Sequence, residues 1–268
     1  MVVPTATLQT VAVQGVALEL AHIAGSAALA PIVFLHEGLG SVALWRDFPQ
    51  RVCAATGRAG WVYSRRGYGQ SAPALLPLHA NYLHLEAWQV LPALLAQCNV
   101  KQPVLLGHSD GASIALLHAS RLPTTACIAM APHLFVQDIS LHSIRAACAA
   151  FAAGPLRSKL AKFHADVDHA FVQWSQVWLS EAFASFNITA ECAQITCPLL
   201  ALQGYDDAYG TMAQMDALMG NFTNENPLWP KEMLHRQLLK IEHCGHAPHT
   251  DQPAQVLQAV ADFLQPLG

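Results

Sequence analysis

The sequence predicts an α/β fold built on a mostly parallel sheet of about eight strands, flanked by helices and carrying an inserted helical cap. Two observations support this fold class. Short continuous apolar runs alternate with helical stretches along most of the chain, as buried parallel strands and their crossover helices require. The strand rhythm stops between Pro132 and Pro198, where apolar and aromatic residues recur at helical spacing instead.

The expected strands can be placed in chain order. Alternating apolar residues on both sides of Gly15 predict an opening antiparallel hairpin. Continuous apolar runs then predict buried parallel strands, and a final strand precedes a closing helix that begins near Pro253. The predicted strands after the hairpin are residues 32–35, 61–63, 104–106, 126–131, 199–202 and 237–241.

The domain organisation follows from this interruption. We expect one domain of 268 residues in which residues 1–133 and 196–268 form the core and residues 134–195 form the helical cap. Within the cap, residues 144–186 show the helical spacing. We interpret their aromatic side chains as anchors of the cap to the body, with direct substrate contact as the alternative. These aromatic residues are Phe163, Phe171, Trp174, Trp178 and Phe183.

Composition excludes several function classes. The net charge is −4 and Lys and Arg form no runs, so no nucleic-acid partner and no anionic membrane surface is expected. No apolar stretch reaches membrane-spanning length, and residues 1–10 lack the order of a secretory signal, which favours a cytoplasmic enzyme with a small-molecule substrate. The 7 cysteines are scattered without paired spacing, unlike a disulfide framework or a zinc site. Nothing in the pattern specifies an oligomeric state.

A nucleophile motif follows one of the expected strands. Residues 107–111 read Gly-His-Ser-Asp-Gly, directly after an apolar run, and their last two residues begin the helical stretch 110–121. In such a turn the two glycines allow a sharp change of direction while Ser109 is held in a strained conformation with its hydroxyl exposed. A serine that merely caps the helix is the alternative. The motif therefore predicts a serine that attacks carbonyl groups.

A base for this serine is expected in the loop after the last strand. The loop contains His243, His246 and His249, and we favour His246 because it lies in a Gly-His-x-Pro-His segment. A metal site made of these histidines and Cys244 has no matching ligand spacing elsewhere, so no metal and no cofactor is expected.

The acid that orients the base is expected after the strand at residues 199–202. Asp206 and Asp207 compete there, and the Gly-x-x-Asp spacing from Gly204 favours Asp207. Asp206 is then expected to cap a helix beginning near Tyr209, or to stabilise the loop.

Two backbone amides are expected to form an oxyanion hole, those of Gly38 and Asp110. The earlier loop begins His36-Glu37, so Glu37 stands where a glycine usually follows the histidine. Three outcomes are open for Glu37. It shifts the donor by one residue, it places a carboxylate near the pocket and disfavours anionic substrates, or it points to solvent.

With these residues, the chain resembles the α/β-hydrolase fold superfamily over nearly its whole length, because Ser109, Asp207 and His246 follow the superfamily's Ser, acid, His order. Residues 64–71 are similar to the superfamily's Asp-x-Arg-Gly-x-Gly-x-Ser segment, with Ser64 in place of the aspartate, and the resemblance implies a structural role behind the oxyanion loop. A serine nucleophile distinguishes the chain from the haloalkane dehalogenases and epoxide hydrolases of this fold, which carry an aspartate.

The expected function is that of a serine hydrolase that cleaves a carboxylic ester through an acyl-enzyme on Ser109. One alternative is a carbon–carbon bond hydrolase of ring-cleavage products, which a pocket arginine would support, with Arg65, Arg66 and Arg145 as candidates. A second is a ligand receptor without turnover on the same fold. His133, after the strand at residues 126–131, is interpreted as a polar residue satisfied at a loop entrance, with a place in the pocket as the alternative. Roles for His108 and Tyr68 are open in the same way.

Overall fold

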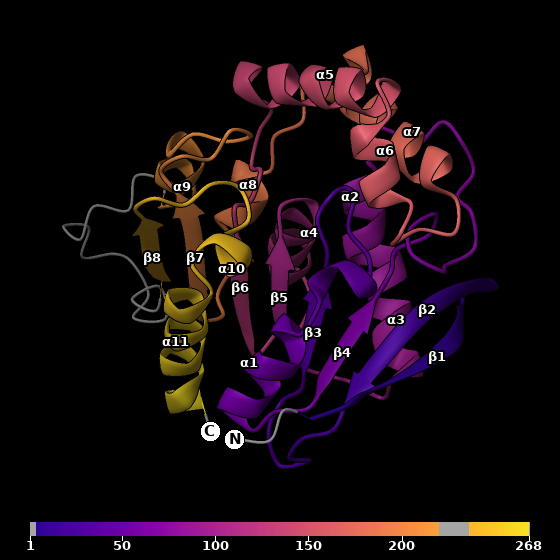
Figure 1. Ribbon diagram of the computed structural model, residues 1–268. Coiled ribbons are helices and arrows are strands. Elements are labelled where there is room, and N and C mark those ends of the chain that lie inside the picture. Colours follow the sequence, from indigo (N-terminus) through magenta and orange to yellow (C-terminus); the bar gives the residue numbers. More distant parts are fainter. Residues whose placement is uncertain (1–3, 220–235, 268) are drawn as a thin grey trace.

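The computed structural model describes residues 4–219 and 236–267, which fold around one eight-stranded sheet (Figure 1). The spatial order of the strands is β1-β2-β4-β3-β5-β6-β7-β8. Their bounds are β1 Ala6–Val13, β2 Val16–Ile23, β3 Ile32–Leu35, β4 Gly60–Tyr63, β5 Val104–His108, β6 Ala126–Met130, β7 Leu199–Gly204 and β8 Arg236–Ile241.

Strand direction divides the sheet into two parts. The hairpin β1–β2 and the pair β2–β4 are antiparallel, and every later pair from β4–β3 to β7–β8 is parallel. Parallel neighbours end together: Leu35 of β3 pairs with Gly107 of β5, and His108 of β5 pairs with Met130 of β6. The predicted mostly parallel sheet is thus confirmed, and the loops that leave these strands begin at one edge.

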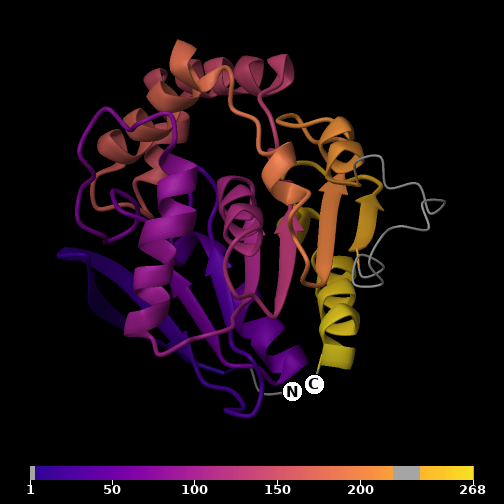
Figure 2. The same ribbon diagram turned by 180° about the vertical axis from the view of Figure 1, so that it is seen from behind.

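Helices cover both faces of the sheet, as Figures 1 and 2 show from opposite sides. Successive strand residues point to opposite faces, so Phe34 and Leu106 belong to one core while Leu35 and Leu105 belong to the other. The first core is closed by α1 and α11, and the second by α2, η2, α3 and α4. These helices are α1 Phe48–Thr56, α2 Tyr82–Leu85, η2 Glu86–Val90, α3 Leu91–Gln97, α4 Asp110–Ala119 and α11 Pro253–Leu264.

Between β6 and β7 the chain forms the predicted helical insertion. Its helices α5, α6 and α7 lie beyond the carboxyl ends of the parallel strands (Figure 1), and the first of them begins earlier than residue 144, at Asp138. Asp166 caps α7 because its side chain accepts a hydrogen bond from the amide of His169. The bounds are α5 Asp138–Ala152, α6 Pro155–Leu160, α7 Val167–Trp178, η3 Glu181–Phe183 and α8 Thr189–Cys192.

The loop after β7 differs from its predicted structure. The next helix, α9 (Ala213–Met219), begins at Ala213 and not near Tyr209, so Asp206 does not cap it. The reason is that the Asp207 carboxylate accepts hydrogen bonds from the amides of Tyr209 and Gly210, at 2.7 and 3.2 Å, and holds this stretch as a loop. After β8 the chain continues into the short helix α10 (Pro248–Asp251) and then α11.

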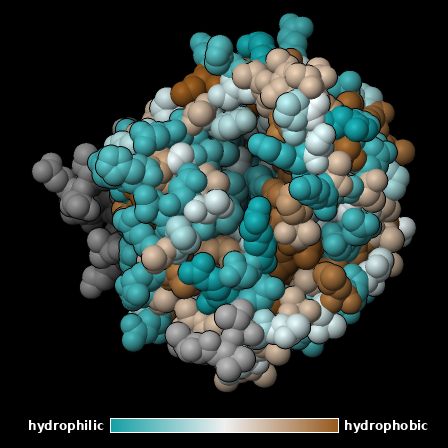
Figure 3. All heavy atoms as spheres, in the orientation of Figure 1, coloured by the Kyte–Doolittle hydropathy of each residue, from teal (hydrophilic) through white to brown (hydrophobic). Residues whose placement is uncertain are grey.

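The surface is mixed in character. On the face shown in Figure 3, hydrophilic residues intermingle with smaller groups of hydrophobic ones. Within residues 4–219 and 236–267, no helix combines the length and apolar character that crossing a membrane requires.

Candidate active site

The turn after β5 brings Ser109 to the sheet edge in a strained conformation. Ser109 has φ 54° and ψ −119°, a backbone conformation that residues other than glycine rarely adopt. Glycine is required on both sides by close packing: a β-carbon on Gly107 would overlap the carbonyl of Gly111, and one on Gly111 would overlap the carbonyl of Leu35. The strand and helix therefore meet at a distance that only glycines permit, with Ser109 at the tip.

His246, in the loop between β8 and α10, contacts both Ser109 and Asp207. Its Nε2 lies 2.9 Å from the Ser109 Oγ, and its Nδ1 lies 2.9 Å from each carboxylate oxygen of Asp207. A carboxylate only accepts hydrogen bonds, so Nδ1 carries the ring proton and Nε2 is left to accept from the serine hydroxyl. This arrangement prepares Ser109 to lose its proton to His246.

Of the two competing acids, the structure brings Asp207 to His246. Asp207 is buried, while Asp206 is exposed and its amide donates to the carbonyl of Cys244. Burial favours the protonated acid, but the hydrogen bond and charge of His246 outweigh it and lower the pKa of Asp207 below its ordinary value. Asp207 therefore stays ionised and holds the ring of His246 in one orientation.

The other two histidines of the loop lie elsewhere. His243 is exposed and its backbone carbonyl accepts from the side chain of Gln252. The His249 ring packs against Trp45 and Phe48, with ring centroids 5.0 and 5.1 Å apart. His246 is thus the histidine of this loop that reaches Ser109.

The loop after β3 carries Gly38 to the same pocket. A β-carbon on Gly38 would overlap the indole of Trp174, so the bulk of that cap residue, and not an unusual φ, requires glycine here. Gly38 and Asp110 both line the pocket beside Ser109. Asp110 is the first residue of α4, so its amide has no acceptor within the helix. Both predicted amides are therefore near the serine.

Residues 64–71, the segment similar to the superfamily's Asp-x-Arg-Gly-x-Gly-x-Ser pattern, pack behind the loop that carries Gly38. Arg65 is buried and its guanidinium donates to the carbonyls of His36 and Glu37. Ser64 accepts from the amide of Val42 at 2.9 Å. This segment stabilises the loop around Gly38. Arg65 binds the backbone of that loop and does not line the pocket.

Glu37 lines the pocket, as the second of the three alternatives describes, and it also forms a contact that none of them describes. Its carboxylate lies 3.5 Å from Nδ1 of His108, an ion-pair distance. The opposite nitrogen of His108, Nε2, lies 2.6 Å from the backbone carbonyl of His246 and therefore donates to it. Burial opposes charge on both groups, yet each partner outweighs it, so the pKa of Glu37 is lowered and the pKa of His108 is raised. This pair joins the loop of Gly38 to the loop of His246.

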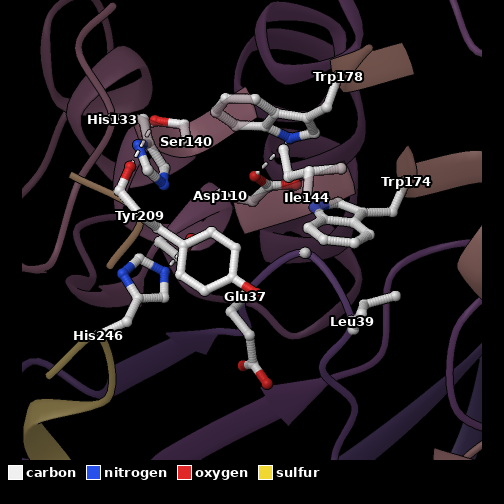
Figure 4. Close-up of a pocket in the computed structure, with 12 residues that line it drawn as sticks. Glu37, Leu39, Asp110, His133, Ser140, Ile144, Trp174, Trp178, Tyr209 and His246 are labelled. Carbon is white, nitrogen blue, oxygen red and sulfur yellow. Dashed lines mark hydrogen bonds between the residues drawn. The ribbon is translucent and has the colours of Figure 1, made fainter. Parts of the chain in front are cut away.

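The pocket at Ser109 is small and mostly apolar, with a volume of about 120 Å³ (Figure 4). Among residues 4–219 and 236–267, no arginine or lysine lines it, and Arg65 lies 3.6 Å from the Asp110 carboxylate. The lining residues are Glu37, Gly38, Leu39, Ser109, Asp110, His133, Ser140, Ile144, Trp174, Trp178, Tyr209 and His246.

The cap aromatic residues serve two purposes. Phe171 and Phe183 are buried in the core, as expected of anchors. Trp174 and Trp178, one helical turn apart on α7, are also buried but line the pocket. Trp178 additionally donates from Nε1 to the Asp110 carboxylate at 3.2 Å, which ties α7 to the start of α4. The two tryptophans therefore anchor the cap, as interpreted, and they also line the pocket, so that substrate contact stays a prediction for them.

His133 is the pocket residue that the sequence interpretation placed wrongly. It is buried, lines the pocket, and its ring centroid lies 4.9 Å from that of Trp178 and 5.5 Å from that of His246. Its Nδ1 has no hydrogen-bond partner among the described residues, so it is not a satisfied loop residue. The available signal was its position three residues after the end of β6, at the same sheet edge as Ser109.

Within the part of the chain that the structure describes, no group of three or more His, Cys, Asp or Glu side chains is arranged to hold a metal ion.

The sequence is similar to a known protein family and to a curated relative. Residues 32–259 match the family described as "Alpha/beta hydrolase family". A curated relative, the biotin biosynthesis bifunctional protein BioHC of Cellvibrio japonicus (strain Ueda107), is 28% identical over 223 residues. That match covers 72% of this chain and 42% of the relative, so the chain spans less than half of that protein's length.

Solved structures share the fold at low sequence identity. A hydrolase from Pseudomonas aeruginosa PA01 matches with a TM-score of 0.73 at 15% identity, over 96% of this chain and 98% of that one. The enol-lactonase from Burkholderia xenovorans LB400 matches with a TM-score of 0.70 at 17% identity, over 96% and 100% of the two chains. The family match extends over well more than half of the sequence and agrees with the sheet, the inserted helices and the turn at Ser109, so the chain belongs to the alpha/beta hydrolase family.

Proposed function

We propose that this protein is a serine hydrolase that cleaves a short, uncharged carboxylic ester through an acyl-enzyme on Ser109. One observation carries the proposal: the Ser109 Oγ, both nitrogens of His246 and the Asp207 carboxylate form a continuous hydrogen-bonded series at 2.9 Å, beside a pocket. Ser109 acts as nucleophile, His246 as base, and Asp207 as the group that orients His246.

In the first half of the reaction, the Ser109 Oγ forms a bond to the ester carbonyl carbon while its proton passes to Nε2 of His246. The amides of Gly38 and Asp110 donate to the carbonyl oxygen as it becomes negatively charged. The bond between the carbonyl carbon and the alcohol oxygen then breaks, and His246 returns the proton to the departing alcohol. Water repeats these steps on the acyl-enzyme and releases the acid and free Ser109.

The pocket supports a short and uncharged acyl group. A cavity of roughly 150 Å³ holds a benzene ring, so a volume of about 120 Å³ takes a group of slightly smaller size. The lining is largely apolar. In the part of the chain that the structure describes, it includes no cationic side chain to pair with a carboxylate, as the acidic products of ring cleavage would require. This favours an ester over the carbon–carbon bond hydrolase alternative. A lactone is a cyclic ester and would react by the same steps.

We also propose that residues 134–195 act as a cap domain over a core of residues 1–133 and 196–268. The contact of Trp174 with Gly38 and the hydrogen bond from Trp178 to Asp110 support this, because both bring helix α7 to the residues around Ser109. The cap then determines which acyl groups fit, while the core carries the reaction.

Labelling combined with turnover tests the proposal. Wild-type protein should react with a fluorophosphonate at one site and should hydrolyse p-nitrophenyl acetate and butyrate over many turnovers. Ser109→Ala should lose the label and lower kcat by roughly four to six orders of magnitude. Ser158→Ala, at an exposed position on α6, serves as the matched control and should match wild type.

Two outcomes would contradict the proposal. Labelling of Ser109 without multiple turnovers on any ester, thioester or lactone would instead favour a ligand receptor. Retained hydrolysis by Ser109→Ala would show that another residue is the nucleophile.

A further inference from the structure

His133 is placed where it can touch a substrate. It follows β6, whose last residue, Met130, pairs with His108 next to Ser109. Its ring lies beside those of Trp178 and His246, and all three surround the pocket (Figure 4). Ser109 lines the same pocket, so a substrate that reaches Ser109 shares this pocket with the His133 ring.

The ring has an unused hydrogen-bonding atom. His133 is 3% exposed, and its Nδ1 is buried with no partner among the described residues. A buried polar atom without a partner costs about 1–3 kcal/mol, and most such atoms in folded proteins are satisfied. Nδ1 has almost no accessible surface, so a ligand in the pocket does not reach it directly. The other ring nitrogen, Nε2, also forms no hydrogen bond with the described residues and is not fully buried, so it is the atom that a ligand can meet.

Neighbouring polar groups are already engaged in other contacts. The Ser113 hydroxyl donates to the backbone carbonyl of His133 at 2.7 Å and accepts from its amide, which fixes the main chain and leaves the ring untouched. The Ser140 hydroxyl donates to the carbonyl of Tyr209. These contacts fix the main chain of His133 and engage the nearby hydroxyls, so neither the Ser113 nor the Ser140 hydroxyl binds the His133 ring.

The ring is neutral when the pocket is empty. Burial, together with the nearby His246, lowers the pKa of His133 to about 3. A neutral imidazole carries one donor and one acceptor nitrogen and cannot form an ion pair with a carboxylate. A hydroxyl group suits either nitrogen because it both donates and accepts.

We propose that His133 is a substrate-binding residue that hydrogen-bonds a hydroxyl group of the ester substrate close to the scissile bond. The inference rests on the proposed ester hydrolysis and names the class of ester: short, uncharged and hydroxylated. The apolar part of such a substrate lies against Leu39, Ile144 and the two tryptophans, and its hydroxyl meets His133.

Pairs of esters that differ by one hydroxyl in place of a methyl group test this directly. The acyl pair is methyl 3-hydroxybutyrate, as each enantiomer, and methyl 3-methylbutyrate. The alcohol pair is 2-hydroxypropyl acetate and isobutyl acetate. For each pair the ratio of kcat/KM values is measured in a pH-stat and divided by the ratio of the rates with hydroxide alone, which removes intrinsic reactivity.

Wild type should favour the hydroxylated member of at least one pair by about tenfold or more, since a site that hydrogen-bonds a hydroxyl rejects the analogue lacking it. His133→Leu should reduce this ratio to about 1 while retaining hydrolysis of the methyl-bearing ester, and its Tm should not fall below that of wild type, because the unpaired atom is gone. His133→Gln, which keeps a donor and an acceptor, should retain part of the preference. His142→Gln, at an exposed position on α5, is the control.

A kcat/KM ratio of about 1 for both pairs, after division by the hydroxide ratio, would overturn the role of His133 and leave ester hydrolysis standing. A wild-type preference that persists in both His133→Leu and His133→Gln would overturn it as well. Absence of turnover on every ester, aryl esters included, would overturn the proposed function together with this inference.

Discussion

Two histidine–carboxylate pairs lie side by side in this protein, Asp207–His246 and Glu37–His108, with the two imidazole centroids 5.2 Å apart. In the first pair Nδ1 of His246 faces the acid and Nε2 faces the Ser109 hydroxyl. In the second pair Nδ1 of His108 also faces the acid, but Nε2 donates to the backbone carbonyl of His246. A carboxylate beside a histidine thus takes two different roles in the two pairs.

The difference lies in what the second nitrogen can do. Nε2 of His246 carries no proton and is free to accept one, which is what a base requires. Nε2 of His108 carries a proton and donates it in a hydrogen bond to a backbone carbonyl, which can only accept. It therefore cannot act as a base, and this ring instead positions the loop of His246. An acid beside a histidine therefore does not identify a base until the partner of the other nitrogen is known.

The largest expected effect separates the two histidines. His246→Ala should lower kcat by roughly four to six orders of magnitude because the base is lost. His108→Gln, whose amide can still donate to the His246 carbonyl, should lower kcat by less than about tenfold. Steady-state kinetics on p-nitrophenyl butyrate, with Tm as a check of folding, measures both. Similar losses in the two variants would contradict the assignment of His246 as base.

The next effect separates the two adjacent acids. Asp207→Asn should lower kcat by about four orders of magnitude, because the amide no longer holds the His246 ring in the reactive tautomer. Asp206→Asn, at an exposed position of the same loop, is the matched control and should remain close to wild type. A larger loss for Asp206→Asn would reverse the choice of acid.

Breaking the second pair should have a moderate effect on the reaction. Glu37→Gln and His108→Ala each release a contact between the loop of Gly38 and the loop of His246, and a displacement of about 1 Å costs roughly 10- to 100-fold in rate. The loss should appear in kcat more than in KM, and His108→Gln should recover most of it. Unchanged kcat in both variants would show that the pair does not position the site.

The smallest effect is a pH dependence of stability. The pKa of Glu37 is lowered from 4.5 in the folded protein, so its contribution is present above that value and is lost as the pH falls. The pKa of His108 is raised from 6.5, so its contribution is complete below that value and is lost as the pH rises through the folded pKa.

Both contributions coexist between about pH 4.5 and 6.5. The difference in the free energy of unfolding between wild type and Glu37→Gln should therefore be greatest there, on the order of 1 kcal/mol, and smaller above about pH 8. The difference in Tm should follow the same trend. Calorimetry across this range measures it. A difference that increased steadily with pH would contradict the ion pair.

The elements of the fold were predictable because they depend on local pattern. Apolar runs marked β3 to β7 within one or two residues of their observed ends, and glycine at 107 and 111 marked the turn at Ser109. Boundaries set by a side chain far along the chain or by a loop contact were predicted less well. The start of α9 was wrong because the Asp207 carboxylate binds the amides of Tyr209 and Gly210.

The candidate site divides in the same way. By itself the sequence determined the residue types, their chain order and the strand after which each one stands, and parallel strands bring their carboxyl ends to one edge. Ser109, Asp207, His246, Gly38 and Asp110 were therefore all predicted to meet at this edge.

Only the tertiary structure decided how side chains from separate elements pair. Trp174 lies against Gly38, Glu37 pairs with His108, and His133 reaches the pocket with an unpaired nitrogen. Each contact joins segments that are distant in sequence, and which polar atoms find partners depends on packing in three dimensions and not on spacing along the chain.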